Sequence, residues 1–247
     1  MKPCCLLFLL ITLCLNVSAQ PKIKFNVKHV FVADFTLRKN TLNINRATKA
    51  FFEDEKYIVR KTCDGEWGGS IWFKDKRTGI EYSCSATCPV IVNKIKDSYY
   101  VTASLTHMSG FSTILEISNP KAMDIFKKPI KKNIVNGKEV IYAGDLESQS
   151  QNGTKVLLDS IGVLTLGSFP YKEELYHIVS DRQRTYLATI ENRRFIMQEQ
   201  ILDHGLVTYD PEMIKTADGH YVMFFDDANS SGYFDVKGDM ITVNIYK

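Results

Sequence analysis

The sequence lacks a strong charge of either sign, and it lacks any long apolar run beyond its N-terminus. Its 31 basic and 28 acidic side chains leave a formal net charge of +3 over 247 residues. That charge is too small to indicate a nucleic-acid-binding protein. No segment after the N-terminus is apolar for long enough to span a membrane. With 45% hydrophobic residues, the composition is that of an ordinary globular protein.

Several familiar catalytic motifs are also missing. The chain contains no GxSxG elbow, no HExxH zinc motif, no P-loop and no GxGxxG sequence opening a helix. These absences leave serine hydrolase, zinc protease, nucleotide hydrolase and dinucleotide-dependent chemistry without support. The sequence therefore indicates a compartment and an architecture more clearly than it indicates an activity.

The N-terminus has the pattern of a secretory signal. Lys2 precedes a short apolar run, Cys4–Leu15, and small residues lead to a cleavage site after Ala19. The apolar run is too short to cross a bilayer. We therefore expect residues 1–19 to be a signal peptide, residues 20–247 to form a single domain, and the protein to be secreted or periplasmic.

Cysteine is scarce once this segment is removed. Only Cys63, Cys84 and Cys88 remain, so an oxidising compartment permits at most one internal disulfide and leaves one thiol. No CxxC pair is present and no histidine lies near these cysteines in the sequence. We therefore assign no metal ligands and expect no cofactor.

The rest of the chain is dominated by strand signals. Short runs of Val, Ile, Tyr, Phe and Thr are bounded by Gly, Asn, Asp and Pro. A polar turn followed by an extended apolar segment recurs roughly every 40 residues, as in propeller blades. The five phrases begin at Asp54, Asp97, Asn136, Arg182 and Asp218. This pattern predicts an all-β five-bladed propeller, with a β-sandwich as the alternative fold.

Individual strands follow from the repeat. In the second unit we expect strands at Pro89–Lys96, Tyr99–Leu105 and Ser112–Ile117. Met240–Tyr246 is expected to be an outer strand of the last unit. His29–Leu37 falls outside the repeat, and we expect it to close the ring beside that last unit.

The loops after the second strand of each blade are predicted to share one edge. They contain an aromatic ring, an imidazole, a guanidinium group and several carboxylates, which together suit a polar ligand such as a sugar or glycan. The carboxylates also leave a divalent cation such as calcium possible. The expected ligand-binding residues are Asp64, Glu66, Trp67, His107, Asp145, Arg193 and Asp226.

The same register predicts the disulfide. Cys63 lies in the first of these loops and Cys88 precedes the first strand of the next blade, on the same rim. A bond from Cys63 to Cys84 would have to skip a strand, roughly 10 Å, which is beyond disulfide reach. We therefore prefer the pairing of Cys63 with Cys88.

One segment resembles a known family. The stretch from Tyr209 to Phe225 reads YDPEMIKTADGHYVMF, and it is similar to a blade of the arabinanase-like five-bladed glycoside hydrolases, with Asp-Pro at the start of a strand and a DG turn after it. A similar phrase begins at Cys88, where cysteine replaces the acid. The resemblance covers single blades and implies that Asp210 occupies the position of a catalytic aspartate.

Glycoside hydrolysis needs a second carboxyl group, roughly 5 to 10 Å from the first. Glu191, Glu66 and Asp226 are candidates, and Glu191 is the partner we assign to Asp210. Three functions therefore stay open: a module that binds a carbohydrate or another polar ligand, a glycoside hydrolase, and a propeller that binds a partner protein.

Overall fold

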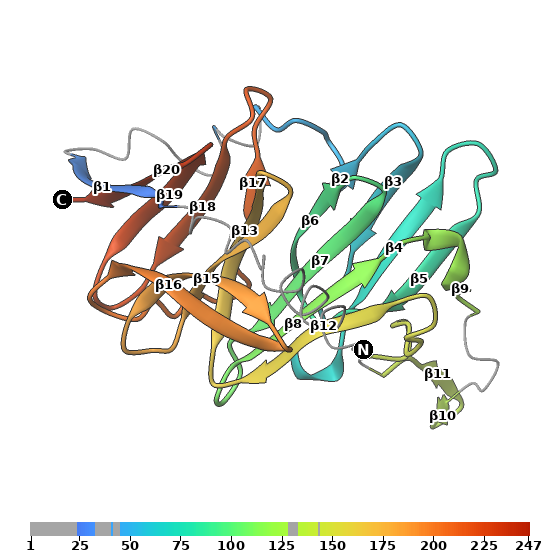
Figure 1. Cartoon of the computed structure of the whole chain (residues 1–247). Helices are drawn as coiled ribbons and strands as arrows, with labels where there is room; N and C mark the ends of the chain where they lie inside the picture. Colours follow the sequence, from blue (N-terminus) through green and yellow to red (C-terminus); the bar gives the residue numbers. More distant parts are fainter. Residues whose placement is uncertain (1–23, 33–40, 42–44, 128–132, 143) are drawn as a thin grey trace, which may run out of the picture.

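The computed structural model describes residues 24–32, 41, 45–127, 133–142 and 144–247. The predicted signal peptide, residues 1–19, lies outside these ranges. The described residues form an all-β protein with four sheets of four or five strands each and one separate two-stranded hairpin (Figure 1). Buried apolar side chains on the strands give the sheets faces that pack against their neighbours.

We number the sheets one to four along the chain. The first contains β2 (Phe52–Glu53), β3 (Tyr57–Lys61), β4 (Ser70–Asp75), β5 (Glu81–Ser85) and β9 (Asp124–Ile125). The second contains β6 (Pro89–Ile95), β7 (Ser98–Leu105), β8 (Phe111–Ile117) and β12 (Lys155–Ile161). The third contains β13 (Leu164–Tyr171), β14 (Glu174–Ser180), β15 (Thr185–Glu191) and β16 (Arg194–Leu202). The fourth contains β17 (Met213–Lys215), β18 (Tyr221–Asp226), β19 (Ser231–Lys237), β20 (Met240–Tyr246) and β1 (Asn26–Val32).

The third repeat unit does not form a blade. It forms a hairpin of β10 (Asn133–Val135) and β11 (Lys138–Val140), joined by Asn136 and Gly137, which both have positive φ. The turn signal was therefore correct, but its strands are three residues long and carry exposed side chains such as Ile134. The described residues thus form four sheets of four or five strands instead of the expected five blades.

The expected strands of the second sheet and the outer strand β20 are confirmed to within a residue at each end. The prediction for the third sheet was wrong by one strand. The segment after Arg182 was expected to form the second strand of this sheet, but it forms the third, β15. The turn between β13 and β14 uses Lys172 and Glu173 with positive φ. Residues of these types give no sequence signal for such a turn, so this hairpin was missed.

The N-terminal strand joins the last sheet. β1 pairs with β20 in parallel, from Asn26 opposite Met240 to Val32 opposite Tyr246. The expected place of His29–Leu37 beside the last unit is confirmed up to Val32, whereas the expected closure of a ring stays a prediction. Residues 33–37 lie outside the described ranges. The first and last segments of the domain are therefore tied together.

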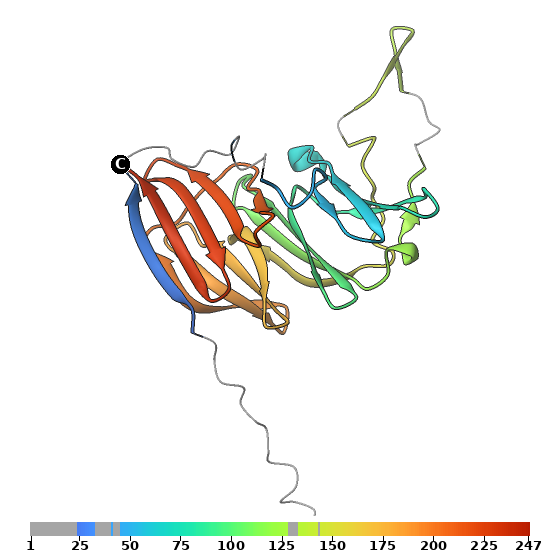
Figure 2. The same cartoon turned by 90° about the horizontal axis from the view of Figure 1, so that it is seen from above.

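Two apolar clusters lie between the sheets. The larger joins the second, third and fourth sheets and includes Leu166, Ile178 and Phe234, each fully buried. The smaller joins the first and second sheets and includes Phe73 and Val101. Seen from above, the sheets follow one another in chain order, and the hairpin of β10 and β11 projects from the array (Figure 2).

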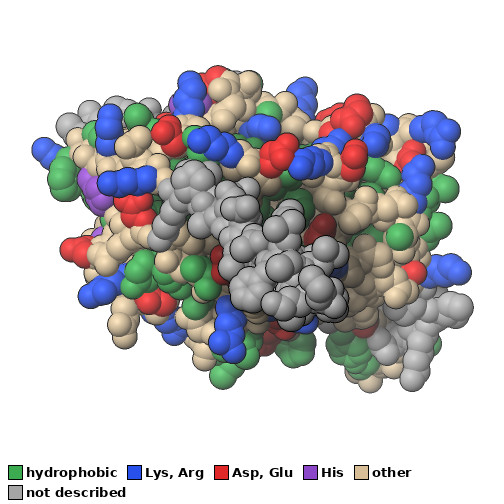
Figure 3. Space-filling view, viewed as in Figure 1, with side chains coloured by type: hydrophobic (Ala, Val, Ile, Leu, Met, Phe, Trp, Pro, Cys, Tyr) green, Lys and Arg blue, Asp and Glu red, His purple; other side chains and the backbone are tan. Residues whose placement is uncertain are grey.

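Few backbone bonds link the two ends of this array. Ala47 N donates to Lys215 O at 3.0 Å, and Arg46 forms an isolated bridge with Thr216. An ion pair of 2.8 Å also joins Arg46 to Glu212. On the face shown in Figure 3, the described basic and acidic side chains are interspersed rather than segregated.

Candidate functional site

The predicted disulfide is confirmed: Cys63 is bonded to Cys88, with their Cα atoms 4.4 Å apart. Cys63 follows β3 and Cys88 precedes β6, so the bond joins the first and second sheets at one end of their strands. The third cysteine, Cys84, is buried, and burial raises the pKa of its thiol to about 12. We call the loops at this end the disulfide edge; they comprise residues 62–69, 86–88, 106–110, 144–148, 203–212 and 226–230.

Contacts between these loops show that they share one edge. Thr106 Oγ1 donates to Thr208 O at 2.7 Å, and His204 Nε2 lies 2.9 Å from Ser230 Oγ. Arg182 donates to the carbonyl of Met108. Loops from all four sheets therefore meet here, although the loop at 191–194, which the repeat placed among them, does not.

The loop at 144–148 is fixed to the first sheet by two carboxylates. Asp64 Oδ2 accepts a hydrogen bond from Gly144 N at 3.0 Å. Glu147 is buried, and its Oε2 accepts from Thr62 Oγ1 and Ser70 Oγ, each at 2.5 Å. Although the third repeat unit forms no blade, these bonds bring its loop, and with it Asp145, to the disulfide edge.

Trp67 is held outward at this edge. It ends a short 3₁₀ helix, Gly65–Trp67. Gly65 begins this helix and Gly68 follows it, and both have positive φ, which favours glycine. Its side chain is 61% exposed. A Cβ on Gly144 would lie 2.7 Å from Trp67 O, so the loop at 144–148 approaches this turn closely only because residue 144 is glycine.

A contact between an imidazole and a carboxylate neighbours this tryptophan. His107 Nε2 lies 3.0 Å from Glu66 Oε2, and both side chains are substantially exposed. The pair links the loop after β3 to the loop after β7, across two sheets. It offers a carboxylate oxygen and an imidazole nitrogen to solvent beside an indole ring, a combination that suits a ligand with hydroxyl groups and an apolar face.

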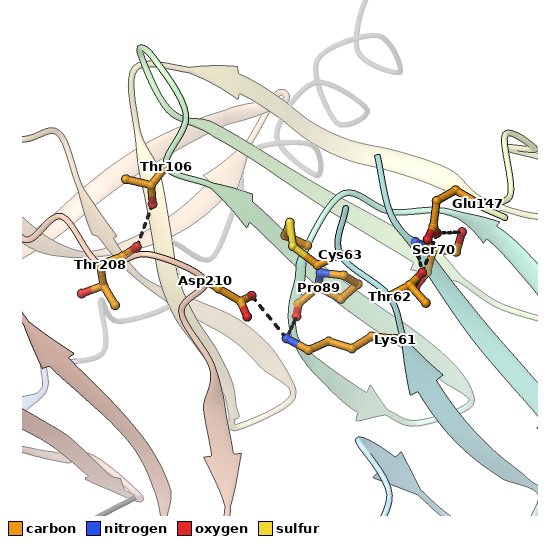
Figure 4. The surroundings of a disulfide bond; sticks show 10 residues. Lys61, Thr62, Cys63, Ser70, Pro89, Thr106, Glu147, Thr208 and Asp210 are labelled. Atoms are coloured by element: carbon orange, nitrogen blue, oxygen red, sulfur yellow. Dashed lines mark hydrogen bonds and ion pairs between the residues drawn. A yellow bond between two sulfur atoms is a disulfide. The ribbon is translucent and has the colours of Figure 1, made fainter. Parts of the chain in front are cut away.

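Asp210 lies on the same edge, close to the disulfide (Figure 4). Its Oδ1 is 3.6 Å from Lys61 Nζ, which also donates to Pro89 O at 2.7 Å. The side chain of Asp210 is half exposed, and its backbone has positive φ. Lys61 thus connects the first sheet to the segment that leads into β17.

Asp226 ends β18 and is exposed at the same edge. The next residue, Asp227, accepts hydrogen bonds from Asn229 N and Ser230 N and closes the loop. Of the nine residues predicted for the catalytic and ligand-binding sites, seven therefore lie at the disulfide edge: Asp64, Glu66, Trp67, His107, Asp145, Asp210 and Asp226.

Glu191 and Arg193 do not lie at this edge, and their expected placement was wrong. β15 starts at the edge with Thr185 and ends at Glu191, about 20 Å further along the strand. Both residues instead line a cleft that also involves Lys96 and Lys172. The cause is the shift of one strand in the third sheet, so the pair of Asp210 with Glu191 is not brought together.

Sequence reasoning missed the roles of two residues at the edge. Tyr209 is 79% exposed beside Asp210, and Lys61 is partly buried between Asp210 and the disulfide. A lysine at the end of a strand normally indicates a solvated position, so no signal pointed to Lys61. For Tyr209, an aromatic residue in a segment rich in Asp and Pro was a signal that could have been used.

The described residues contain no group of three or more His, Cys, Asp or Glu side chains placed to hold a metal ion. None of the helices in the described part of the chain is long and apolar enough to cross a membrane. No family model, no curated protein and no solved structure matches this chain.

Proposed function

We propose that this protein is an exported binding module of propeller-like architecture that captures a carbohydrate, or a polar ligand of similar chemistry, on its disulfide edge. The observation that carries the proposal is the exposed indole of Trp67 beside the paired side chains of Glu66 and His107. A sugar presents an apolar C–H face that stacks on an indole and hydroxyl groups that need both donors and acceptors.

The rigidity of the edge supports this proposal. The disulfide, the bond from Gly144 to Asp64 and the buried Glu147 fix the loops around Trp67. Since the loops are already ordered, a ligand would lose little affinity to ordering them. The export is supported by the signal pattern in the sequence and by the disulfide, which forms in oxidising compartments.

Calorimetry of the mature protein against a panel of soluble glycans tests the proposal. We expect heat of binding with at least one glycan, and we expect Trp67→Ala to reduce the affinity at least tenfold. Phe31→Ala is the matched control, because Phe31 is an exposed aromatic residue on the outer strand β1. No heat with any glycan, or equal losses in the two variants, would overturn the proposal.

A second candidate is a protein partner. Exposed apolar side chains share the edge with Trp67: Met108 is 76% exposed, and Leu146, Val207 and Tyr209 are also exposed. Aromatic residues and methionine are enriched at protein interfaces. Co-purification from the native envelope, with Met108→Glu as the variant expected to lose the partner, distinguishes this candidate from glycan binding.

Glycoside hydrolysis is the weaker alternative in this geometry, because Asp210 faces Lys61 and Glu191 lies elsewhere. Glu66 and Asp226 remain as carboxylates on the same edge. Release of reducing sugar from a polysaccharide, abolished by Asp210→Asn, would establish hydrolysis in place of simple binding.

A further inference from the structure

A cleft of about 1500 Å³ lies between the outer parts of the second and third sheets, away from the disulfide edge. Strands β7 and β12 form one wall, and β14, β15 and β16 form the other. This volume is larger than that of most small-molecule sites, which range over roughly 300 to 1,000 Å³. Much of the lining is apolar, including Val156, Leu157, Leu175, Ile190 and Ile196.

The basic and acidic side chains that line the cleft are nearly equal in number. Two of the basic residues have ion-pair partners: Lys96 pairs with Glu173 at 2.7 Å, and Lys155 pairs with Glu116 at 2.9 Å. The remaining charged lining residues are Lys172, Arg193, Glu174 and Glu191. Two positive and two negative side chains give no preference for an anion or a cation, so the lining favours an uncharged ligand.

One buried polar side chain lacks a partner in this lining. His177, on β14, is 1% exposed, and neither of its ring nitrogens has a hydrogen-bond partner among the described residues. Burial lowers the pKa of His177 to about 3, so its imidazole is neutral at physiological pH. A neutral imidazole has one N–H donor and one acceptor nitrogen, and leaving both unpaired in an apolar interior is unfavourable.

Elsewhere, the interface between the same two sheets pairs its polar groups. Asn93 Nδ2 donates to Ser168 O at 3.0 Å, and Thr102 Oγ1 lies 2.5 Å from Ser168 Oγ. These groups are buried like His177, and Ser168 lies directly opposite His177 in the ladder of β13 and β14. Around His177 the nearest aromatic contact is the ring of Phe195, which meets the imidazole edge-on with centroids 5.7 Å apart. The interface thus leaves a hydrogen-bonding group without a partner just beneath the lining of the cleft, and a ligand reaches its ring nitrogens once the side chains that cover them shift.

We propose that this cleft binds an uncharged, mainly apolar small molecule whose hydroxyl group hydrogen-bonds to His177. A hydroxyl can both donate to the acceptor nitrogen and accept from the N–H, whichever tautomer is present. The apolar walls would cover the body of the molecule. This site lies on other strands than the disulfide edge, so it does not depend on the function proposed for that edge.

Fluorine NMR of the full mature chain tests the site with two probes, 4-fluorophenol and fluorobenzene, which differ in the hydroxyl group. We expect saturable binding of 4-fluorophenol, and binding of fluorobenzene weaker by roughly three- to tenfold, the value of one neutral hydrogen bond. In His177→Phe this preference should disappear. Ile196→Glu, at a partly exposed position of the lining, should weaken both probes, whereas Trp67→Ala should change neither.

The ring nitrogens of His177 give a readout that needs no variant. In the wild-type protein labelled with ¹⁵N-histidine, 4-fluorophenol should shift the nitrogen resonances of His177, and fluorobenzene should leave them in place. Absence of saturable binding, equal affinity for the two probes, or a preference for the phenol that survives in His177→Phe would each overturn the proposal. If His177→Phe does not fold, unshifted nitrogen resonances with bound 4-fluorophenol overturn it equally.

Discussion

The disulfide edge and the cleft between the second and third sheets treat polar and apolar groups in opposite ways. At the edge the buried carboxylate of Glu147 has hydroxyl partners, and the large apolar side chains of Trp67 and Tyr209 are exposed. In the cleft the apolar side chains form the walls, and the buried polar group, His177, lacks a partner among the described residues.

The difference shows where each region can interact with a ligand. The edge has satisfied its buried carboxylate and presents rings and the polar side chains of Glu66 and His107 to solvent, so its free binding capacity is at the surface. The cleft has an unfilled hydrogen-bonding group in its interior. Substitutions in the two regions should therefore have different effects on stability, on its pH dependence and on binding.

The largest effect should come from acid and depend on His177. The folded protein protonates this imidazole only near pH 3, whereas the unfolded chain does so near its ordinary value of 6.5. Between these values the unfolded state binds more protons, so the free energy of unfolding falls as the pH falls, by about 1.4 kcal/mol per pH unit. Chemical denaturation from pH 7 to pH 4 should show a slope smaller by that amount in His177→Phe.

The control for this experiment is Phe195→Leu. It alters the packing around His177 but removes no titrating group, so its pH slope should match that of the wild type. An unchanged slope in His177→Phe would mean that the imidazole is not buried in its neutral form. In that case the contrast between the cleft and the edge would fail.

The disulfide should have the next largest effect. Cys63 and Cys88 are 25 residues apart, and closing a loop of that length stabilises a protein by about 3.5 kcal/mol in the chain-entropy description. Cys63→Ala/Cys88→Ala should lose an amount of this order in urea unfolding. Dithiothreitol should destabilise the wild type similarly and leave the double variant unchanged; sensitivity of the double variant to the reductant would contradict this assignment.

The disulfide and the second sheet show what local sequence signals could predict. Runs of β-branched and aromatic residues in Pro89–Ile95 and Ser98–Leu105, with a turn between them, predicted the strands and their ends. Once those ends were known, only Cys88 lay within reach of Cys63. The third sheet failed because the turn at Lys172 and Glu173 adopts positive φ without glycine or asparagine, and tertiary packing rather than local propensity stabilises it.

The residues of the candidate site were predicted correctly only where the strands that precede them were predicted correctly. Glu66, Trp67 and His107 come together because their loops follow correctly predicted strands. Glu191 and Arg193 were misplaced because the error of one strand in the third sheet moved them to the other end of β15. His177 gave no signal, since the absence of a hydrogen-bond partner is a property of the packed interior and not of the sequence.

Glu147 should have a moderate effect that is confined to the edge. Glu147→Ala would leave the hydroxyls of Thr62 and Ser70 without their carboxylate partner in a buried position. We expect a loss of about 2 to 3 kcal/mol in the free energy of unfolding. Amide hydrogen exchange should also increase in residues 144–148, whereas exchange in β14 and β15 should stay unchanged. Faster exchange throughout the third sheet would contradict an effect limited to the edge.

The smallest effect on stability should accompany the largest effect on binding to the edge. Trp67 is mostly exposed, so Trp67→Ala should change the free energy of unfolding by less than about 0.5 kcal/mol. Urea unfolding and glycan calorimetry on the same preparation of Trp67→Ala separate the two quantities. If the ring instead covered the loop beneath it, the variant would lose stability and binding together, and the edge would depend on this side chain for its own structure. A loss of affinity at unchanged stability is expected only if the ring is held outward to contact a ligand.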